Sequence, residues 1–219
     1  MSYSPTLLLG DDVHFEQDAH SYRDADGSEC LSVTQAIQIA GLIDYSMVRP
    51  EYLEVARRRG ELVHQACALA DKGEDLNHYV LPDLLWPYIS AYLSFVAEMR
   101  FLVNPELVER RMIVDLFGHR IGMTPDAVGT IDGVPTLIER KATSAAHPAW
   151  AIQTAGYQMG LRAARVQVRQ RMAVQLLPTA KYRVHVFDDE NDTETFAAVY
   201  RVAAWKRKHN LANLSKLAD

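Results

Sequence analysis

The apolar residues of this chain change their spacing once, and that change limits the folds that are open to it. Between Pro50 and Phe101 they recur every three or four positions, whereas from Glu106 to Thr143 they alternate with polar residues. The first spacing predicts amphipathic helices, and the second predicts β-strands with one buried face. A fold of the α/β class, with helices packed on a sheet, is therefore expected.

The expected elements follow in a simple order. Helices are predicted near 50–70 and 82–101, each with a proline in its first turn. Three strands should follow as an antiparallel meander with tight turns at Gly118 and at Asp132-Gly133. The remaining predicted elements are a helix, two strands and a final helix. The predicted strands are 105–118, 124–133, 134–143, 169–177 and 181–188, and the last two predicted helices are 148–164 and 193–214.

The first forty residues predict an addition to this core. Apolar and polar residues alternate over 13–34 around a turn at 24–27, as in a β-hairpin, and Thr34 is expected to cap a short helix that ends near Gly41. No repeat or linker divides the chain. We therefore expect one domain over 1–219, with an N-terminal elaboration (1–48), a core (49–190) and a C-terminal helix (191–219).

Charge and hydropathy narrow the class of protein. No stretch approaches the roughly 18 apolar residues of a membrane helix, and the amino terminus lacks the pattern of a signal peptide, so a cytoplasmic protein is expected, with no membrane partner. The net charge is −5, yet residues 162–216 hold 11 Lys or Arg against 5 Asp or Glu. This basic segment could face a polyanion, or its charges could be solvated faces of a sheet and a helix.

A group of three charged residues carries the chemistry that the sequence predicts. Glu139 and Lys141 are two apart on a predicted strand, so their side chains leave the same face. The hairpin turn at 132–133 should bring Asp126 back beside them. Two converging carboxylates repel each other unless a cation lies between them, and oxygen ligands suit Mg²⁺ or Mn²⁺. Such an ion beside a lysine is suited to phosphodiester hydrolysis.

These residues belong to a longer pattern. GMTPDAVGTIDGVPTLIERKAT followed by QTAGY resembles the PD-(D/E)xK nuclease superfamily, in its RecB-like exonuclease branch with a Q-x-x-x-Y helix. Upstream, RRRGELVHQA resembles the R-G-x-x-x-H helix of that branch, and the N-terminal SVTQAI resembles stand-alone nucleases of phage or prophage type. The resemblance implies a restriction-endonuclease-like core, in which helices flank a central mixed sheet of about five strands. It also implies a metal-dependent deoxyribonuclease, an exonuclease of DNA repair, recombination or phage DNA metabolism.

The resemblance also implies roles for individual residues. Asp126, Glu139 and Lys141 would be catalytic, with Asp126 and Glu139 binding Mg²⁺ or Mn²⁺. His64 and the backbone carbonyl of Arg140 would be further ligands. DNA would be held by the pair Gln153 and Tyr157, and Arg162 and Arg165 of the basic segment are expected to contact it too.

Alternatives stay open for several of these assignments. His64 could be a buried structural histidine, and Gln153 and Tyr157 could be a surface amide and a packing residue. Glu109 could join the metal site, although an exposed strand position is the favoured interpretation. For the whole chain the alternatives are a catalytically silent nucleic-acid-binding module and a restriction-type endonuclease. No helicase motif is present, so any motor would be a separate chain, and the oligomeric state is left open.

Overall fold

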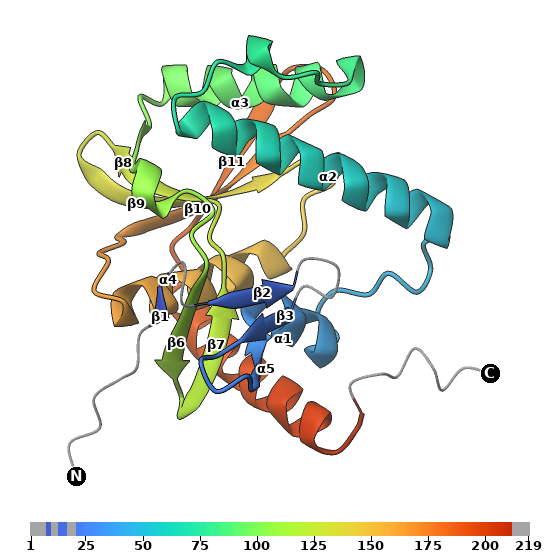
Figure 1. Ribbon diagram of the computed structural model, residues 1–219, viewed down its shortest axis with the longest axis vertical. Helices are drawn as coiled ribbons and strands as arrows, with labels where there is room; N and C mark the ends of the chain where they lie inside the picture. Colours follow the sequence, from blue (N-terminus) through green and yellow to red (C-terminus); the bar gives the residue numbers. More distant parts are fainter. Residues whose placement is uncertain (1–7, 10–12, 17–20, 212–219) are drawn as a thin grey trace.

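The strands of the protein form two mixed sheets, which the computed structural model describes over residues 8–9, 13–16 and 21–211 (Figure 1). The five-stranded sheet has the order β11-β10-β9-β8-β5 and contains the predicted site. Its strands are β5 (Leu102–Val103), β8 (Ala127–Ile131), β9 (Val134–Lys141), β10 (Gln170–Leu176) and β11 (Tyr182–Phe187). The six-stranded sheet, β1-β6-β7-β4-β3-β2, comprises β1 (Leu8–Leu9), β2 (His14–Glu16), β3 (Ser21–Arg23), β4 (Glu29–Ser32), β6 (Met112–Leu116) and β7 (His119–Met123).

The five-stranded sheet confirms the predicted mixed sheet flanked by helices. Asp132 and Gly133 both have positive φ, 48° and 77°, as a two-residue hairpin turn requires, and they join β8 to β9. After α4 (Ala149–Ala163) the chain returns as β10, parallel to β9, and β11 then pairs antiparallel with β10. The parallel β9–β10 pair needs such a long crossover, which the helix provides.

The predicted three-stranded meander is wrong, because its strands belong to different sheets. β6 and β7 form one hairpin in the six-stranded sheet, whereas β8 and β9 form another in the five-stranded sheet. Pro125 lies between β7 and β8, and a proline has no N–H to continue a ladder. The segment 119–123, which was not expected to be a separate strand, pairs with β6 on one side and parallel with β4 on the other.

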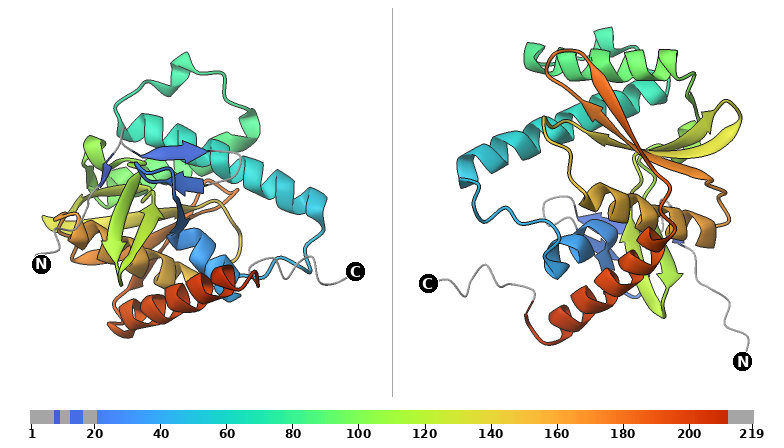
Figure 2. Two further views of the ribbon diagram at one scale, coloured as in Figure 1. Left: turned by 60° about the horizontal axis from the view of Figure 1, so that its bottom comes forward. Right: turned by 180° about the vertical axis from the view of Figure 1, so that it is seen from behind.

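Helices cover both faces of the five-stranded sheet (Figure 2). α2 (Pro50–Asp71) and α3 (Trp86–Glu98) enclose one apolar core with Ala127 and Ile138 of the sheet. α4 lies on the other face, in a second core with Val128 and Leu137. All three helices were predicted, and α2 and α4 match the expected bounds within one residue.

The N-terminal elaboration joins the second core. The expected hairpin is present as β3 and β4, and Ser32, not Thr34, caps the short helix α1 (Val33–Ala40) through a capping box with Gln35. α1 packs against α4 and against α5 (Asn191–Lys208), the helix predicted over 193–214. The last part of that prediction, 212–214, lies outside the described residues. In the described part of the chain, every helix is too short or too polar to cross a membrane.

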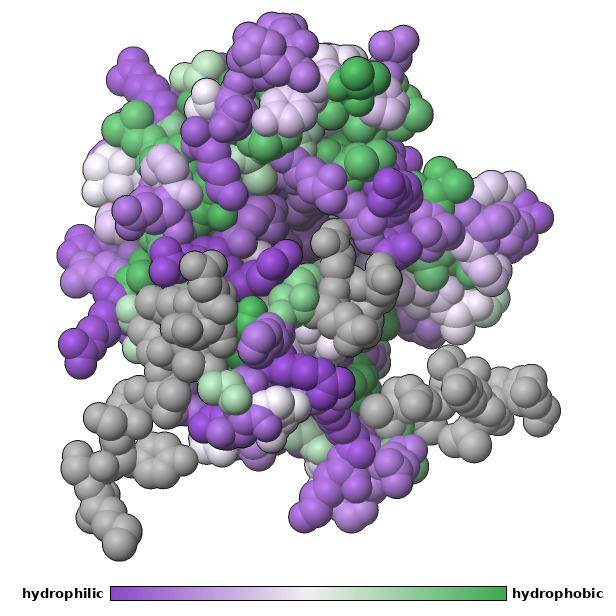
Figure 3. All heavy atoms as spheres, in the orientation of Figure 1, coloured by the Kyte–Doolittle hydropathy of each residue, from purple (hydrophilic) through white to green (hydrophobic). Residues whose placement is uncertain are grey.

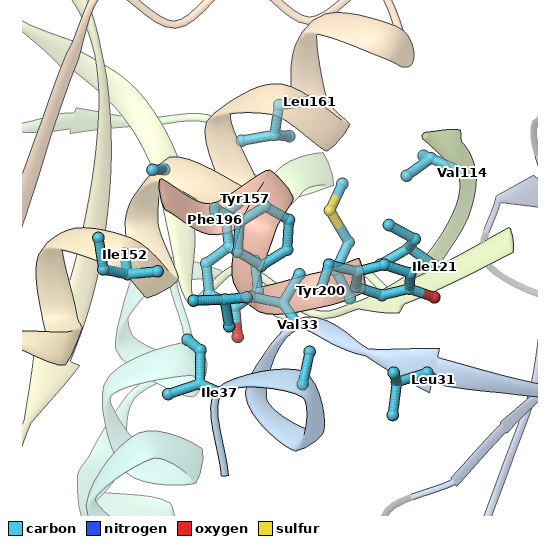
Figure 4. Packing of buried hydrophobic residues seen from close by; sticks show 14 of the residues in the cluster. Leu31, Val33, Ile37, Val114, Ile121, Ile152, Tyr157, Leu161, Phe196 and Tyr200 are labelled. Atoms are coloured by element: carbon cyan, nitrogen blue, oxygen red, sulfur yellow. The ribbon is translucent and has the colours of Figure 1, made fainter. Parts of the chain in front are cut away.

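Close packing holds α4 between the two sheets. Figure 4 shows Tyr157 and Leu161 of α4 among side chains from α1, α5, β6 and β7. Gly156 lets the Phe196 ring of α5 approach: a Cβ added at Gly156 would lie 2.6–2.9 Å from three atoms of that ring. A glycine as well as apolar side chains therefore places the helix that carries Gln153, Tyr157 and Arg162.

This packing predicts opposite effects for two glycine substitutions. Gly156→Ala should lower the free energy of unfolding by about 1–3 kcal/mol, because the rigid Phe196 ring must shift. Gly60→Ala is the matched control in helix α2, where an added Cβ meets nothing within 4 Å, and it should raise stability by about 0.5–1 kcal/mol. Urea unfolding of both variants measures this. Equal stabilisation by the two substitutions would contradict the described packing.

Candidate metal centre and active site

The three predicted catalytic residues meet at one end of the β8–β9 hairpin. Ala127 pairs with Ile138, so the next position of each strand places Asp126 beside Glu139. Lys141 follows on the same face of β9, and its Nζ donates a hydrogen bond to Glu139 Oε1 over 2.9 Å. The hairpin geometry expected from the sequence is thus what brings an acid from one strand to an acid and a base on the next.

Helix α2 adds His64 to this group. His64 Nδ1 lies 3.1 Å from Asp126 Oδ1 and 3.7 Å from Glu109 Oε1. One ligand atom from each of these three residues lies within 4.8 Å of the others, a grouping that could hold a metal ion. That His64 binds a metal and is not a purely structural histidine stays a prediction, for which its contacts with two carboxylates provide the geometry.

Glu109 is the site residue for which the favoured expectation was wrong. It does not lie on an exposed strand face, because β6 begins only at Met112. Its φ is +50°, and its N–H donates to the Asp126 carbonyl over 3.0 Å. A non-glycine residue in this left-handed region carries strain that surrounding contacts must outweigh. The sequence gives little sign of this turn, since glycine, the usual marker, is absent from the segment.

Burial and like charge set the protonation of the acids. Burial, together with the nearby Asp126 charge, raises the pKa of Glu139 to about 7. Burial also opposes ionisation of Asp126, but the positive charges of His64, Arg140 and Lys141 outweigh it and lower its pKa to about 2. For His64, burial disfavours the charged ring, yet Asp126 and Glu109 raise its pKa to about 10. The site therefore retains protons that a cation could replace.

One atom of the site supports a cation directly. Glu139 Oε2 is buried and, among the described residues, has no hydrogen-bond partner, whereas Oε1 accepts from Lys141 and Gln153. A buried carboxylate oxygen without a partner is costly. A hard divalent cation close to Glu139 and Asp126 would satisfy it, and the donor set of carboxylate oxygens and one imidazole fits Mg²⁺ or Mn²⁺.

Gln153 and Tyr157 of α4 reach the site, where their recorded contacts are with protein groups. Gln153 accepts a hydrogen bond from Lys141 Nζ (2.8 Å) and donates to Glu139 Oε1 (2.9 Å) and to the Tyr157 hydroxyl (3.1 Å). That hydroxyl also lies 3.4 Å from Thr34 Oγ1 on α1. Both side chains are buried; Gln153 orients Glu139 and Lys141 directly, and Tyr157 contacts Gln153. Their contact with DNA stays a prediction.

The two predicted DNA-binding arginines lie apart from this cluster. Arg162 is exposed in the last turn of α4, and Arg165 is exposed beyond the end of the helix. Nine helical positions separate Gln153 from Arg162, which corresponds to about 13 Å along the axis. Any contact that these arginines make with DNA would therefore be some distance from the reacting bond.

Arg140 contributes more than the backbone carbonyl that the sequence suggested. Its backbone N–H donates to Asp126 Oδ2, and its fully buried side chain points to the opposite face of β9. There the guanidinium pairs with Asp71 and Glu109. That the Arg140 carbonyl binds metal stays a prediction.

Figure 3 shows hydrophilic side chains across the middle of the face seen in Figure 1, between α2 and the N-terminal strands.

Comparison with known proteins supports the fold. No protein-family model and no curated protein matches the sequence. Among solved structures, the protein described as "Putative exonuclease" from Eubacterium rectale is similar over 84% of this chain and 81% of its own, with 14% identity and a TM-score of 0.50. LHK-Exo, solved in complex with dAMP, is aligned over 86% of this chain and 95% of its own, with 16% identity and a TM-score of 0.35. The first likeness shows that this chain shares the fold of that protein.

The raised pKa of Glu139 predicts how stability depends on pH. In EDTA, the unfolded chain loses the Glu139 proton near its ordinary pKa of about 4.5, while the folded protein keeps it up to about pH 7. The raised pKa of His64 gives a separate fall in stability between about pH 6.5 and 10. At Glu139 the folded state binds more protons between pH 4.5 and 7, so stability should also fall as pH rises through this lower range. Glu139→Gln should flatten this fall, as measured by urea unfolding across the range.

Glu194→Gln, at an exposed position on α5, is the control for the loss of one carboxylate. Parallel pH profiles for the wild type and Glu139→Gln would mean that Glu139 is not held as a protonated acid.

Proposed function

We propose that this protein is a metal-dependent deoxyribonuclease that hydrolyses phosphodiester bonds, with Asp126, Glu139 and Lys141 at its active site. The observation that carries the proposal is that Asp126 and Lys141 lie beside Glu139, whose buried Oε2 has no hydrogen-bond partner among the described residues. The fold shared with the Eubacterium rectale protein supports it. It also accords with the resemblance of the sequence to RecB-like nucleases of the PD-(D/E)xK superfamily.

The proposed cofactor is Mg²⁺ or Mn²⁺. Asp126, Glu139, His64 and the Arg140 carbonyl would hold it. Glu109 joins this set because its carboxylate lies close to the His64 imidazole and the Asp126 carboxylate. When bound, such an ion polarises a phosphoryl oxygen and lowers the pKa of water at the site. Three carboxylates against one divalent ion leave the centre anionic, and the nearby cationic side chains offset this excess.

The chain's own groups would perform the remaining tasks. The Lys141 ammonium, which is hydrogen-bonded to Glu139, would offset negative charge that develops on the phosphate during attack. Gln153 holds Lys141 and Glu139 together through one amide. The amide thereby fixes Lys141 beside Glu139. The other carboxylate oxygen of Glu139, Oε2, then remains for the cation.

We further propose that the substrate is DNA with ends or single strands, and that digestion proceeds from an end. The Q-x-x-x-Y and R-G-x-x-x-H helices favour this over a restriction-type endonuclease, since they are the motifs of the RecB-like branch. A silent binding module is disfavoured because binding alone gives no reason to bury Glu139 beside Asp126 at an electrostatic cost. Roles in repair, recombination or phage DNA metabolism, and a separate helicase partner, belong to the same proposal.

Linear and closed circular substrates test the proposed activity. Purified protein with Mg²⁺ or Mn²⁺ should degrade end-labelled linear DNA and leave covalently closed circles intact, while EDTA should abolish the activity. Cutting of circles would point to an endonuclease. Binding of DNA with no cleavage under any metal would establish the silent module instead.

Substitutions should separate metal binding from catalysis. Asp126→Ala should weaken Mn²⁺ binding at least 100-fold and abolish cleavage, because it removes an oxygen ligand. Lys141→Ala removes no ligand, so Mn²⁺ affinity should stay within about threefold of wild type while cleavage falls by about 10²–10³-fold. Calorimetric titration of Mn²⁺ alongside a nuclease assay measures both effects.

The matched control for Lys141 is Lys181→Ala, an exposed lysine between β10 and β11, which should change neither quantity. A Lys141→Ala protein that cleaves DNA at the wild-type rate would place the active site on other residues.

A further inference from the structure

The Arg140 side chain is the largest fully buried side chain in the described part of the protein. It leaves β9 on the face opposite to Glu139 and Lys141, and so points into the core between the sheet and helices α2 and α3. A guanidinium in such a place is costly unless charged partners and hydrogen bonds surround it. Its hydrogen-bond and ion-pair partners connect this core with the metal centre.

One branch of the guanidinium is paired with Asp71, in the last turn of α2. Arg140 Nη1 donates to Asp71 Oδ2 over 3.1 Å, and the same carboxylate accepts the Tyr92 hydroxyl of α3 at 2.7 and 2.8 Å. The Tyr92 ring also lies 5.2 Å from the guanidinium carbon, within reach of a cation–π contact. Asp71 is buried on the side of the sheet opposite to Glu139.

The other branch reaches the metal centre. Arg140 Nη2 donates to Glu109 Oε1 over 3.0 Å and to the Asp126 carbonyl over 2.9 Å. That carbonyl also accepts the Glu109 N–H, from a backbone held at positive φ. One nitrogen of Arg140 therefore ties the side chain of Glu109 to the main chain that bears Asp126, and Glu109 Oε1 lies 3.7 Å from His64 Nδ1.

The charges explain why Asp71 is needed. Arg140 carries one positive charge and has three carboxylates within ion-pair distance, at 3.1 Å (Asp71), 3.0 Å (Glu109) and 3.7 Å (Asp126). Asp71 can balance that charge from outside the metal centre. The Glu109 carboxylate then receives a hydrogen bond that fixes its place, while its negative charge stays available to a cation. Without Asp71, the whole charge of Arg140 would fall on the two site carboxylates.

We propose that Asp71 and Arg140 are positioning residues for the metal centre: the pair holds Glu109 in place through Arg140 Nη2 and leaves the Glu109 charge free to bind the cation. This inference rests on the proposed function, because it assigns Glu109 to that metal site. It places a determinant of metal affinity in the core behind the sheet, where no ligand can touch it.

The substitution Asp71→Asn tests the proposal. It keeps the shape of the side chain and removes its charge, so Arg140 should pair fully with Glu109 and withdraw it from the cation. Calorimetry should then show Mn²⁺ affinity about tenfold below wild type, while the cleavage rate at saturating Mn²⁺ stays within about threefold. Asp24→Asn is the matched control, since Asp24 is also buried and paired with an arginine, Arg120. It should lower stability and leave Mn²⁺ affinity unchanged.

A second background separates positioning from a direct effect of charge on the metal. In a Glu109→Gln protein the closer site carboxylate is gone, and Asp126 keeps only its longer 3.7 Å contact with Arg140, so adding Asp71→Asn should lower Mn²⁺ affinity less than about threefold. Glu109 is partly exposed, so the single variant is expected to fold. Should Asp71→Asn itself unfold, loss of Mn²⁺ affinity in Glu109→Gln alone supports the ligand assignment, and unchanged affinity overturns the proposal.

Three other results would also overturn it. Unchanged Mn²⁺ affinity in Asp71→Asn would make the network structural only, and an equal loss in both backgrounds would mean that Asp71 does not act through Glu109. Failure of the wild type to bind Mn²⁺ would remove both this inference and the proposed function. A wild-type protein that binds Mn²⁺ and cleaves no DNA would refute the proposed function alone, because the affinity measurements on positioning would still hold.

Discussion

The structure around the candidate site depends on one electrostatic problem, which is how to keep several carboxylates together where water has little access. Asp126 and Glu139 are both buried at the end of one hairpin, and Glu109 approaches from the preceding segment. The negative charge of Asp126 adds to the cost of ionising Glu139, as the raised pKa of Glu139 shows. His64, Arg140 and Lys141 each come from a different direction to offset that cost. A divalent cation would complete the balance.

Strand β9 carries positive side chains that offset the carboxylate charges on both of its faces. Glu139 and Lys141 point towards α4, where Gln153 bridges them, and Arg140 between them points towards α2 and α3. The alternation of a β-strand makes this division unavoidable, because neighbouring side chains leave opposite faces. One three-residue segment can therefore present chemistry on one side and a buried support on the other. A helix could not do this, since residues one apart on a helix share no such strict opposition.

The second sheet and its helices act on the site through α4. Gly156 admits Phe196 of α5, and the Tyr157 hydroxyl lies close to Thr34 of α1. Through these contacts the N-terminal hairpin region is joined to the helix that orients Glu139 and Lys141. The fold is shared with the Eubacterium rectale protein at only 14% sequence identity. Periodicity and turns can persist while most side chains change.

Local signals in the sequence were sufficient for the helices α2 and α4, for the hairpin turn at Asp132-Gly133, and for the alignment of Asp126 with Glu139 and Lys141. Each of these depends on residues at most about twenty apart, whose spacing and turn chemistry act before any tertiary contact. The division into two sheets depends instead on a contact between distant parts of the chain, because β7 pairs with β4, some ninety positions upstream. The support for the site was decided in the same way: Arg140 meets Asp71 from 69 positions away and Glu109 from 31. No periodicity records such pairs, since they exist only once the helices have packed on the sheet and a buried charge must find the partners that packing provides.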